Sequence, residues 1–373
     1  MSRRKKRYEN RKKTRQEKMN TFLKKYDNFE NIASYPALYK AALEASKGVK
    51  WKASVQRYLL NIIVRTARAR DDLINEKDIR KGFIEFNLCE RGKLRHIRSV
   101  HFSERVIQKS LCQNVLLPIL THNLIYDNGA SQKDKGTLFA QKRLIRHLCQ
   151  HFRHHGQEGF ILLIDFKSYF DNIDHDTLKN IYRKYIHDPK ILKLTDDFVD
   201  AFGEKGLGLG SETSQIHAIA YPNAVDHFIK DQCGIKAYGR YMDDSYIISN
   251  SKKELEEILT KLKKHFEQLK ITISPKKTHI TDLKHGFCFL KTRFFLTETG
   301  KIIKKPCRKS ITAERRKLKK QGKLMNAGIM TDKDVLTSFV SWSGSMKYRN
   351  ASRTVNNMKQ LLERILNHEK KRN

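Results

Sequence analysis

Acidic residues stand at two places where short candidate strands of the chain end. Asp165 follows the apolar run 159–164, and Asp243 with Asp244 lies between two short segments that we expect to be strands, within residues 238–249. Carboxylates placed in this way supply the oxygen ligands that Mg²⁺ prefers, beside water and substrate phosphates. Two such ions about 3.5–4 Å apart can activate an attacking hydroxyl and stabilise a leaving phosphate. The three acids therefore make a candidate metal centre, although ordinary turn residues would explain them equally well if they stood alone.

The segments around these acids indicate an α+β fold. Residues 159–164 form a short apolar run with many branched side chains, which predicts a buried strand. Residues 238–249 predict a hairpin with the acids at its tip, and pairing of these segments would bring Asp165 to the other two acids. We also expect a helix over 214–231, a helix capped by Ser251 and Glu254, and a strand at 271–273. This order is typical of helices packed on one face of a mainly antiparallel sheet.

The composition predicts a nucleic-acid partner. The chain has 76 Lys and Arg against 40 Asp and Glu, a net charge of +36, and 39% hydrophobic residues, enough for a core. Such a charge attracts polyanions. The six cysteines form no CxxC pair, which argues against a zinc ribbon. No apolar run is long enough for a signal peptide or a membrane span, so we expect a cytoplasmic protein with no membrane partner.

Two basic segments are candidates for contact with phosphate. Residues 1–27 form a basic arm, and residues 301–323 hold eleven Lys and Arg with one acid. The alternative is a solvated tail and a solvated helix face. The candidate nucleic-acid ligands are Arg3, Arg4, Lys5, Lys6, Arg315, Arg316, Lys319 and Lys320. Histidines 147, 151 and 155 repeat at helical spacing, which we interpret as an exposed polar face rather than a metal site.

The sequence around the acids resembles reverse transcriptases. Tyr241-Met242-Asp243-Asp244 resembles their YxDD box, and Asp165-Phe166 with Tyr169-Phe170 resembles their first acidic motif. Similar motifs occur in the family's order over about residues 90–295. They are Gly92–Ile97, Glu104–Gln108, Asn128–Ala130, Lys135–Thr137, Gly208–Gln215, Asn223, Ile273–Thr278 and Gly286–Leu290.

The resemblance implies a right-hand polymerase with fingers, palm and thumb. The palm would be an antiparallel sheet with packed helices, a ferredoxin-like core, and the thumb would be helical. The expected boundaries are 1–27 for the basic arm, 28–158 for the fingers and N-terminal helices, 159–295 for the palm and 296–373 for the thumb. The implied activity is RNA-templated DNA synthesis from dNTPs on a primer by two Mg²⁺ ions, for which Mn²⁺ can substitute.

The resemblance also implies roles for single residues. Asp165, Asp243 and Asp244 would be catalytic metal ligands, and the Phe166 carbonyl would complete a metal shell. Phe170 would exclude a 2′-hydroxyl as a steric gate, with a core phenylalanine as the alternative. Lys277, or its neighbour Lys276, would protonate pyrophosphate, with a solvated lysine as the alternative. The other dNTP-binding candidates are Gln215, Gly210, Lys93, Arg95, Lys133 and Lys135.

Two positions depart from the family pattern. Bacterial relatives often have Arg where this chain has Gln132, which weakens the assignment of the triphosphate ligands. Pro222 replaces a common Leu and should kink the helix after Gln215.

The kind of reverse transcriptase is indicated by Ser214-Gln215, which resembles diversity-generating retroelement enzymes rather than group II intron enzymes. We expect no maturase, endonuclease or RNase H domain in the residues that follow the catalytic motifs. The implied partners are a structured RNA template, a DNA or RNA primer and a small accessory protein. The alternatives are a phage-defence reverse transcriptase and a catalytically silent RNA-binding scaffold.

Overall fold

The computed structural model describes residues 3–90 and 93–370, in two compact units. Unit 1 comprises Met1–Gly136, Phe166–Gly234 and Thr260–Ser274. Unit 2 comprises Thr137–Asp165, Ile235–Leu259 and Pro275–Asn373. Helix α13 (Lys252–Gln268) is divided between them.

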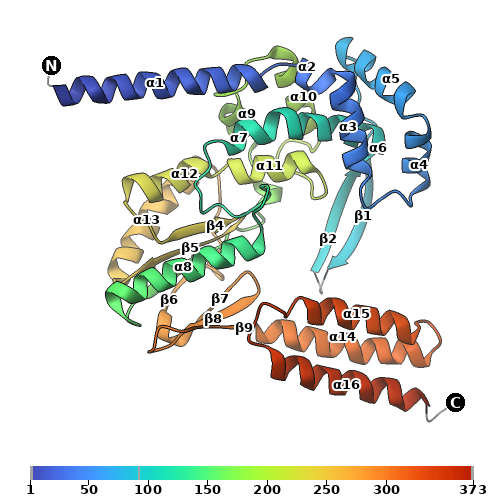
Figure 1. The fold of residues 1–373 in the computed structure, drawn as a ribbon, viewed down its shortest axis with the longest axis vertical. Coiled ribbons are helices and arrows are strands. Elements are labelled where there is room, and N and C mark those ends of the chain that lie inside the picture. The colour runs from blue at the N-terminus through green and yellow to red at the C-terminus, as the bar shows by residue number, and fades with distance from the viewer. Residues whose placement is uncertain (1–2, 91–92, 371–373) are drawn as a thin grey trace. The chain divides into compact units, whose positions relative to one another are not determined.

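A four-stranded antiparallel sheet carries the acidic residues of unit 2. Its strands are β3 (Phe160–Ile164), β4 (Tyr238–Tyr241), β5 (Asp244–Ser249) and β6 (His279–Asp282), in the order β4-β5-β3-β6. Helix α8 (Thr137–His155) covers one face of this sheet (Figure 1). Leu144 and Leu148 of α8 pack there against Ile161 and Ile248. Branched and aromatic residues fill the strands because burial on a pleated surface favours them.

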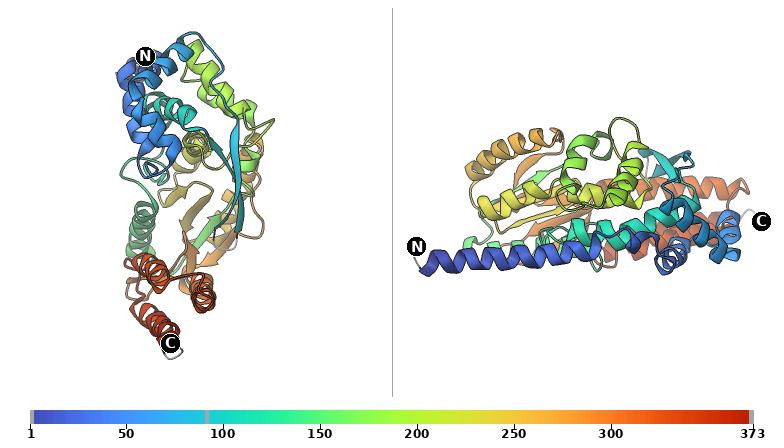
Figure 2. Two further views of the ribbon diagram at one scale, coloured as in Figure 1. Left: turned by 90° about the vertical axis from the view of Figure 1, so that its right-hand side faces the viewer. Right: turned by 90° about the horizontal axis from the view of Figure 1, so that it is seen from above.

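A second sheet and three helices complete unit 2. Strands β7 (Phe287–Phe289), β8 (Thr292–Leu296) and β9 (Ile302–Pro306) are antiparallel. Helices α14 (Arg308–Asn326), α15 (Asp332–Gly344) and α16 (Ser352–Lys370) then form a bundle (Figure 2). Its core includes Leu318, Met325, Phe339, Met358 and Leu362.

Unit 1 is mainly helical, with one long hairpin. The hairpin consists of β1 (Phe83–Glu90) and β2 (Lys93–Val100). The long helix α1 (Arg3–Tyr26) is straight in every view (Figures 1 and 2). The other helices are α2 (Glu30–Ala33), α3 (Tyr35–Ser46), α4 (Ala53–Leu60), α5 (Ile62–Ile74), α6 (Phe102–Leu111), α7 (Leu117–Thr121), α9 (His175–Tyr182), α10 (Pro189–Asp200), α11 (Glu212–Ala220) and α12 (Asn223–His227).

The predicted α+β class and the antiparallel sheet are confirmed. The predicted interruption at Pro222 is confirmed, since α11 ends at Ala220 and α12 begins at Asn223. No helix in the described ranges is both long enough and apolar enough to cross a bilayer.

Two predictions about local structure were wrong. Residues 271–273 form no strand, because the segment they face, after β3 ends at Ile164, is not a strand either: Ile273 makes an isolated bridge to Phe166, and the Thr272 carbonyl accepts from the Lys167 N–H. Of the three histidines predicted to be exposed, His155 is exposed, but His147 and His151 are buried. His147 lies 3.0 Å from the Tyr246 hydroxyl, and His151 donates to the Glu158 carbonyl at 2.7 Å, so both rings have polar partners inside unit 2.

Candidate active site

A tight turn between β4 and β5 presents Asp243. Tyr241 pairs directly with Asp244, so Met242 and Asp243 form a two-residue hairpin loop. Met242 has a φ of 56°, the left-handed conformation that such turns require. The side chain of Arg240 is 1% exposed and donates from Nη1 to the Met242 carbonyl at 3.2 Å. A buried guanidinium thus holds the strained residue of the turn in place.

In this hairpin, the Tyr246 ring packs closely against Gly239 of the neighbouring strand. Gly239 pairs with Tyr246 across β4 and β5. A Cβ atom at Gly239 would lie 2.7 Å from the Tyr246 hydroxyl and 2.9 Å from its ring. The hydroxyl in turn contacts His147 of α8. Glycine in the Tyr-Gly-Arg-Tyr segment therefore leaves the space in which the aromatic ring lies flat against the strand.

Pairing of β3 with β5 brings Asp165 beside the hairpin acids. Ile164 pairs with Ser245, so one further step of the register places Asp165 opposite Asp244. Burial, followed by the negative charges of Asp243 and Asp165, raises the pKa of Asp244 to about 7, against the opposing charge of Lys277. The three carboxylates are thus close enough to repel one another in the absence of a cation.

Lys277 neutralises part of this charge. Its Nζ lies 2.7 Å from both carboxylate oxygens of Asp165. Partial burial disfavours the ammonium, but the contact with Asp165 and the nearby hairpin acids outweigh it and raise the pKa of Lys277. The adjacent Thr278 exchanges contacts with the Asp165 backbone, at 3.3 Å from its N–H and 3.5 Å from its carbonyl. Lys277 therefore neutralises the Asp165 side chain, and Thr278 holds the Asp165 backbone at the end of β3.

The donor chemistry of this edge fits Mg²⁺. Within the described ranges, no three His, Cys, Asp or Glu side chains are arranged to hold a metal ion as they stand. The Lys277 ammonium pairs with Asp165 at the position where a cation would bind. Carboxylates that raise each other's pKa are nevertheless the oxygen ligands that a hard divalent ion stabilises. Asp165, Asp243 and Asp244 would hold the ion after Lys277 moves aside.

In unit 1, a short turn positions Phe170. Ser168 has a φ of 46°, after which the buried Tyr169 donates to the Ala218 carbonyl at 2.6 Å. Phe170 is half-buried, with its ring edge-on to Tyr169 at 5.7 Å between centroids. Tyr169 rather than Phe170 is therefore the core aromatic residue here. Phe166, at the start of this segment, is buried.

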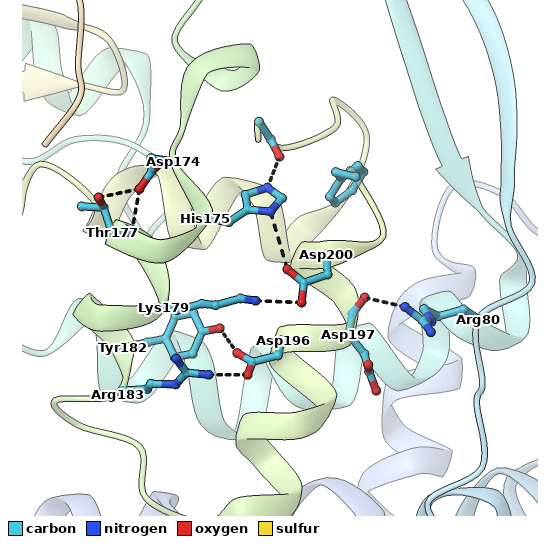
Figure 3. Close-up of polar contacts among 12 residues, drawn as sticks. Arg80, Asp174, His175, Thr177, Lys179, Tyr182, Arg183, Asp196, Asp197 and Asp200 are labelled. Carbon is cyan, nitrogen blue, oxygen red and sulfur yellow. Dashed lines mark hydrogen bonds and ion pairs between the residues drawn. The ribbon is translucent and has the colours of Figure 1, made fainter. Parts of the chain in front are cut away.

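The glycine-rich loop before α11 is hydrogen-bonded to the turn that carries Phe170. The N–H of Leu207 donates to the Phe170 carbonyl at 2.7 Å. His175 donates to the Gly206 carbonyl at 2.7 Å, and its other ring nitrogen faces Asp200, which also binds Lys179 (Figure 3). A network of α9 and α10 side chains thus holds one end of the loop.

A cleft of about 540 Å³ lies beside the other end of this loop, within unit 1. Gly210 and Gln215 both line it. Gly210 has a φ of 113° and a Cβ there would approach Ile97 to 3.2 Å, so glycine fits this position. Gln215 is exposed and accepts from the Ser131 hydroxyl at 3.2 Å.

The four basic dNTP candidates differ in their surroundings. Lys93 begins β2, and its side chain lies outside the described part of the structure. Arg95 is half-buried in the same strand, and Lys133 is exposed. Lys135 donates to the carbonyls of Tyr126 and Asn128, both at 3.0 Å. Its ammonium is therefore engaged by the loop itself, whereas Lys133 faces solvent.

The basic residues of α14 form an exposed helix face. Arg315, Arg316, Lys319 and Lys320 are exposed, while Leu318 packs into the three-helix core. Arg3, Arg4, Lys5 and Lys6 lie in α1, but their side chains are outside the described part of the structure.

Some residues at the site were not predicted as functional. Arg240 and Thr278 support the acidic edge, and Arg105 and Lys109 line the cleft. A charged residue inside the apolar strand 238–241 was a usable signal for Arg240. No sequence signal indicated the contact of Thr278 with Asp165, because this contact depends on the pairing of β6 with β3.

The family described as "Reverse transcriptase (RNA-dependent DNA polymerase)" matches residues 75–308. No curated protein matches the chain. A solved structure of apo telomerase from Candida Tropicalis, truncated from its C-terminal domain, is similar with 14% identity and a TM-score of 0.46. The match covers 60% of this chain and 55% of the telomerase chain, so this chain spans just over half of that relative's length.

Proposed function

Because this chain belongs to the reverse transcriptase family, whose members are RNA-dependent DNA polymerases, we propose that its acidic edge joins dNTPs to a primer on an RNA template. The observation that carries the proposal is the register that sets Asp165 opposite Asp244, beside the Asp243 turn. The raised pKa of Asp244 supports it, since the crowded negative charge calls for cations. A catalytically silent RNA-binding scaffold would not need three carboxylates placed so close together.

The residues of the acidic edge have separate tasks in this reaction. Asp165 and Asp243 would hold the two ions, Asp244 would support them, and the Phe166 carbonyl would complete one shell. When bound there, Mg²⁺, or Mn²⁺ in its place, would supply the charge that activates the primer 3′-hydroxyl and stabilises the leaving pyrophosphate. Lys277 would be displaced from Asp165 by a cation bound to that carboxylate. Its ammonium, 56% exposed in the side chain, is then free to protonate the pyrophosphate.

The turn and loop of unit 1 select the nucleotide. Phe170 presses on the 2′ carbon of the sugar and excludes ribonucleotides. Its half-buried ring supports this role, because a gate must be packed on one side and open on the other. Gly210 and Gln215 line the cleft that receives the template and the nucleotide. Lys93, Arg95 and Lys133 bind the triphosphate, and Lys135 acts by fixing the loop that carries Lys133.

The rest of the chain binds the template and primer. The four-stranded sheet would be the palm, the β1–β2 hairpin would belong to the fingers, and α14–α16 would be the thumb. The exposed basic face of α14 and the basic α1 supply the charge that follows a phosphate backbone. A net charge of +36 on the chain is consistent with such a partner.

Primer extension on an RNA template with Mg²⁺ and labelled dNTPs tests the activity. The wild type should extend the primer, Asp243→Ala should not, and Asp332→Asn, an exposed acid on α15, should match the wild type. No extension by the wild type, or equal extension by Asp243→Ala, contradicts the proposal. Equal folding of the three proteins by circular dichroism shows that any loss is chemical.

For the biological role, we propose a diversity-generating retroelement that uses a structured RNA and a small accessory protein. Ser214-Gln215 supports this assignment by its resemblance to those enzymes, and the pair occupies α11 with Gln215 facing the cleft. A near-repeat pair in the neighbouring DNA that differs at adenines is the expected observation. A structured RNA gene beside defence genes would instead support a phage-defence enzyme that makes a cDNA from a dedicated RNA.

A further inference from the structure

Two cysteines meet at the surface of unit 2. The Cys307 thiol donates a hydrogen bond to Cys288 over an Sγ–Sγ distance of 2.7 Å. Cys288 lies in the middle of β7, where its side chain is exposed between two buried phenylalanines. Cys307 is the N-cap residue of α14, directly after β9. Neither residue belongs to the acidic edge or to the dNTP cleft.

The β7-β8-β9 sheet surrounds this pair with cations. Cys288 pairs with Arg293 of β8, and Arg293 pairs with Lys305 of β9. Directly paired residues of antiparallel strands project to one face, so these three side chains form a row. Cys307 follows the end of β9 with an extended backbone, and its Sγ lies against that of Cys288 on this face. The exposed face of this sheet therefore holds two thiols beside positive charge.

This environment distinguishes the two thiols chemically. The hydrogen bond from Cys307, with help from Arg293 and Lys309 and against the effect of burial, lowers the pKa of Cys288 to about 7. The same contact raises the pKa of Cys307. Cys288 is also the more exposed of the two thiols, since Cys307 is half-buried. Because an accessible thiolate is the attacking species in thiol–disulfide exchange, this geometry makes Cys288 the nucleophile and Cys307 the resolving thiol.

We propose that Cys288 and Cys307 form a reversible oxidation site that closes into a disulfide on reaction with a low-molecular-weight disulfide. The Cys288 thiolate attacks one sulfur of that reagent, forms a mixed disulfide and releases one thiolate. Cys307 loses its proton to solvent and attacks the Cys288 sulfur, which breaks the mixed disulfide and releases the second thiolate. Two protein thiols are oxidised, one disulfide reagent is reduced, and the two released thiolates take up the two protons.

Closure ties β7 covalently to the start of α14. The linked residues are 19 positions apart, so the new loop encloses β8 and β9. Helix α14 carries the exposed basic face of Arg315, Arg316, Lys319 and Lys320. The disulfide would therefore fix the N-terminus of this basic helix to the sheet. This effect does not depend on the reaction at the acidic edge.

The test uses the reduced full chain, oxidised glutathione as the probe, and mass spectrometry of the intact protein and its peptides at pH 7. Wild-type protein should lose two hydrogens and give a linked peptide pair containing Cys288 and Cys307, which dithiothreitol should reverse. Cys307→Ser should stop at a glutathione adduct on Cys288. Cys288 should react at least about fivefold faster than the exposed Cys89, an internal reference on β1.

Three outcomes overturn the proposal: separate glutathione adducts on both cysteines of the wild type, no linked pair at all, or reaction of Cys288 no faster than that of Cys89. A urea-unfolded sample should lose the rate difference, which shows that the fold creates it. None of these measurements involves nucleotide incorporation, so a protein with no polymerase activity can still pass or fail this test.

Discussion

Lys277 and Asp165 are 112 residues apart in sequence, yet the lysine Nζ lies 2.7 Å from both carboxylate oxygens. The lysine thus pairs with the carboxylate that ends β3, beside the Asp243 turn. Its side chain is 56% exposed although it is paired with a carboxylate. In the mechanism proposed above, Lys277 would neutralise Asp165 before a divalent ion binds and would then donate a proton to the leaving pyrophosphate.

Lys277→Ala should slow nucleotide incorporation by about 10²–10⁴-fold, because the leaving pyrophosphate then lacks its proton donor. Single-turnover primer extension measures this directly. Lys276→Ala is the matched control, since Lys276 is the exposed neighbour and Lys277, not Lys276, pairs with Asp165. A large loss in Lys276→Ala with little loss in Lys277→Ala would transfer the proton-donor role to Lys276.

Phe170→Ala should admit ribonucleotides, because removing the ring opens the space at the 2′ carbon of the sugar. The measurement is the ratio of kcat/KM for dNTP over NTP with the same base. Phe170→Tyr keeps the ring and should keep the discrimination. An unchanged ratio in Phe170→Ala would refute the gate and leave Phe170 as a packing residue against Tyr169.

Gly239→Ala should lower the free energy of unfolding by about 1–3 kcal/mol, since the new methyl group meets the Tyr246 ring. Urea denaturation is the appropriate measurement. The control is Gly344→Ala at the end of α15, where a Cβ meets nothing within 4 Å. Equal effects of the two changes would mean that the β4–β5 hairpin can shift to accommodate a side chain.

Asp174 should make stability depend on pH in a defined range. Burial opposes its charge, but Lys270 at 2.7 Å and Thr177 outweigh it and lower the pKa of Asp174 to about 2. A lowered folded-state pKa contributes stability above the unfolded value near 3.8, and this is lost as pH falls toward 2. Asp174→Asn should cost about 1–2 kcal/mol at pH 6 and much less at pH 2. A difference that stays constant over this range would contradict the pKa assignment.

The sequence was sufficient to predict the α+β class, the strand before Asp165 and the hairpin with Asp243 in its turn. These features depend on local patterns, namely an apolar run and alternating residues around a turn. The two wrong predictions depend on distant partners. Residues 271–273 have a strand-like pattern, but a strand needs a paired neighbour, and Ile273 forms a bridge only to Phe166, beyond the end of β3 at Ile164. The spacing of His147 and His151 places them on the same face of the helix. It does not tell whether that face is exposed or is covered by Tyr246 and Glu158.

The candidate site was predictable in its residue types and less so in its contacts. The acids, Gly210 and Gln215 were identified from motifs. The engagement of Lys135 by two carbonyls and the contact of Thr278 with Asp165 follow from packing that no local pattern encodes. For the same reason, the Cys288–Cys307 pair was invisible in a sequence where these residues stand 19 positions apart.

Hydroxyl-radical cleavage by Fe²⁺ bound in place of Mg²⁺ most directly tests whether Asp165 and the Asp243–Asp244 pair share one cation site. Radicals cut the chain only near the ion, so the fragments report which segments surround it. We predict cuts both near residue 165 and near residues 243–244, suppressed together by excess Mg²⁺ and lost together in Asp165→Asn but not in Asp332→Asn. Cuts at only one segment, or a pattern unchanged in Asp165→Asn, would contradict the shared site.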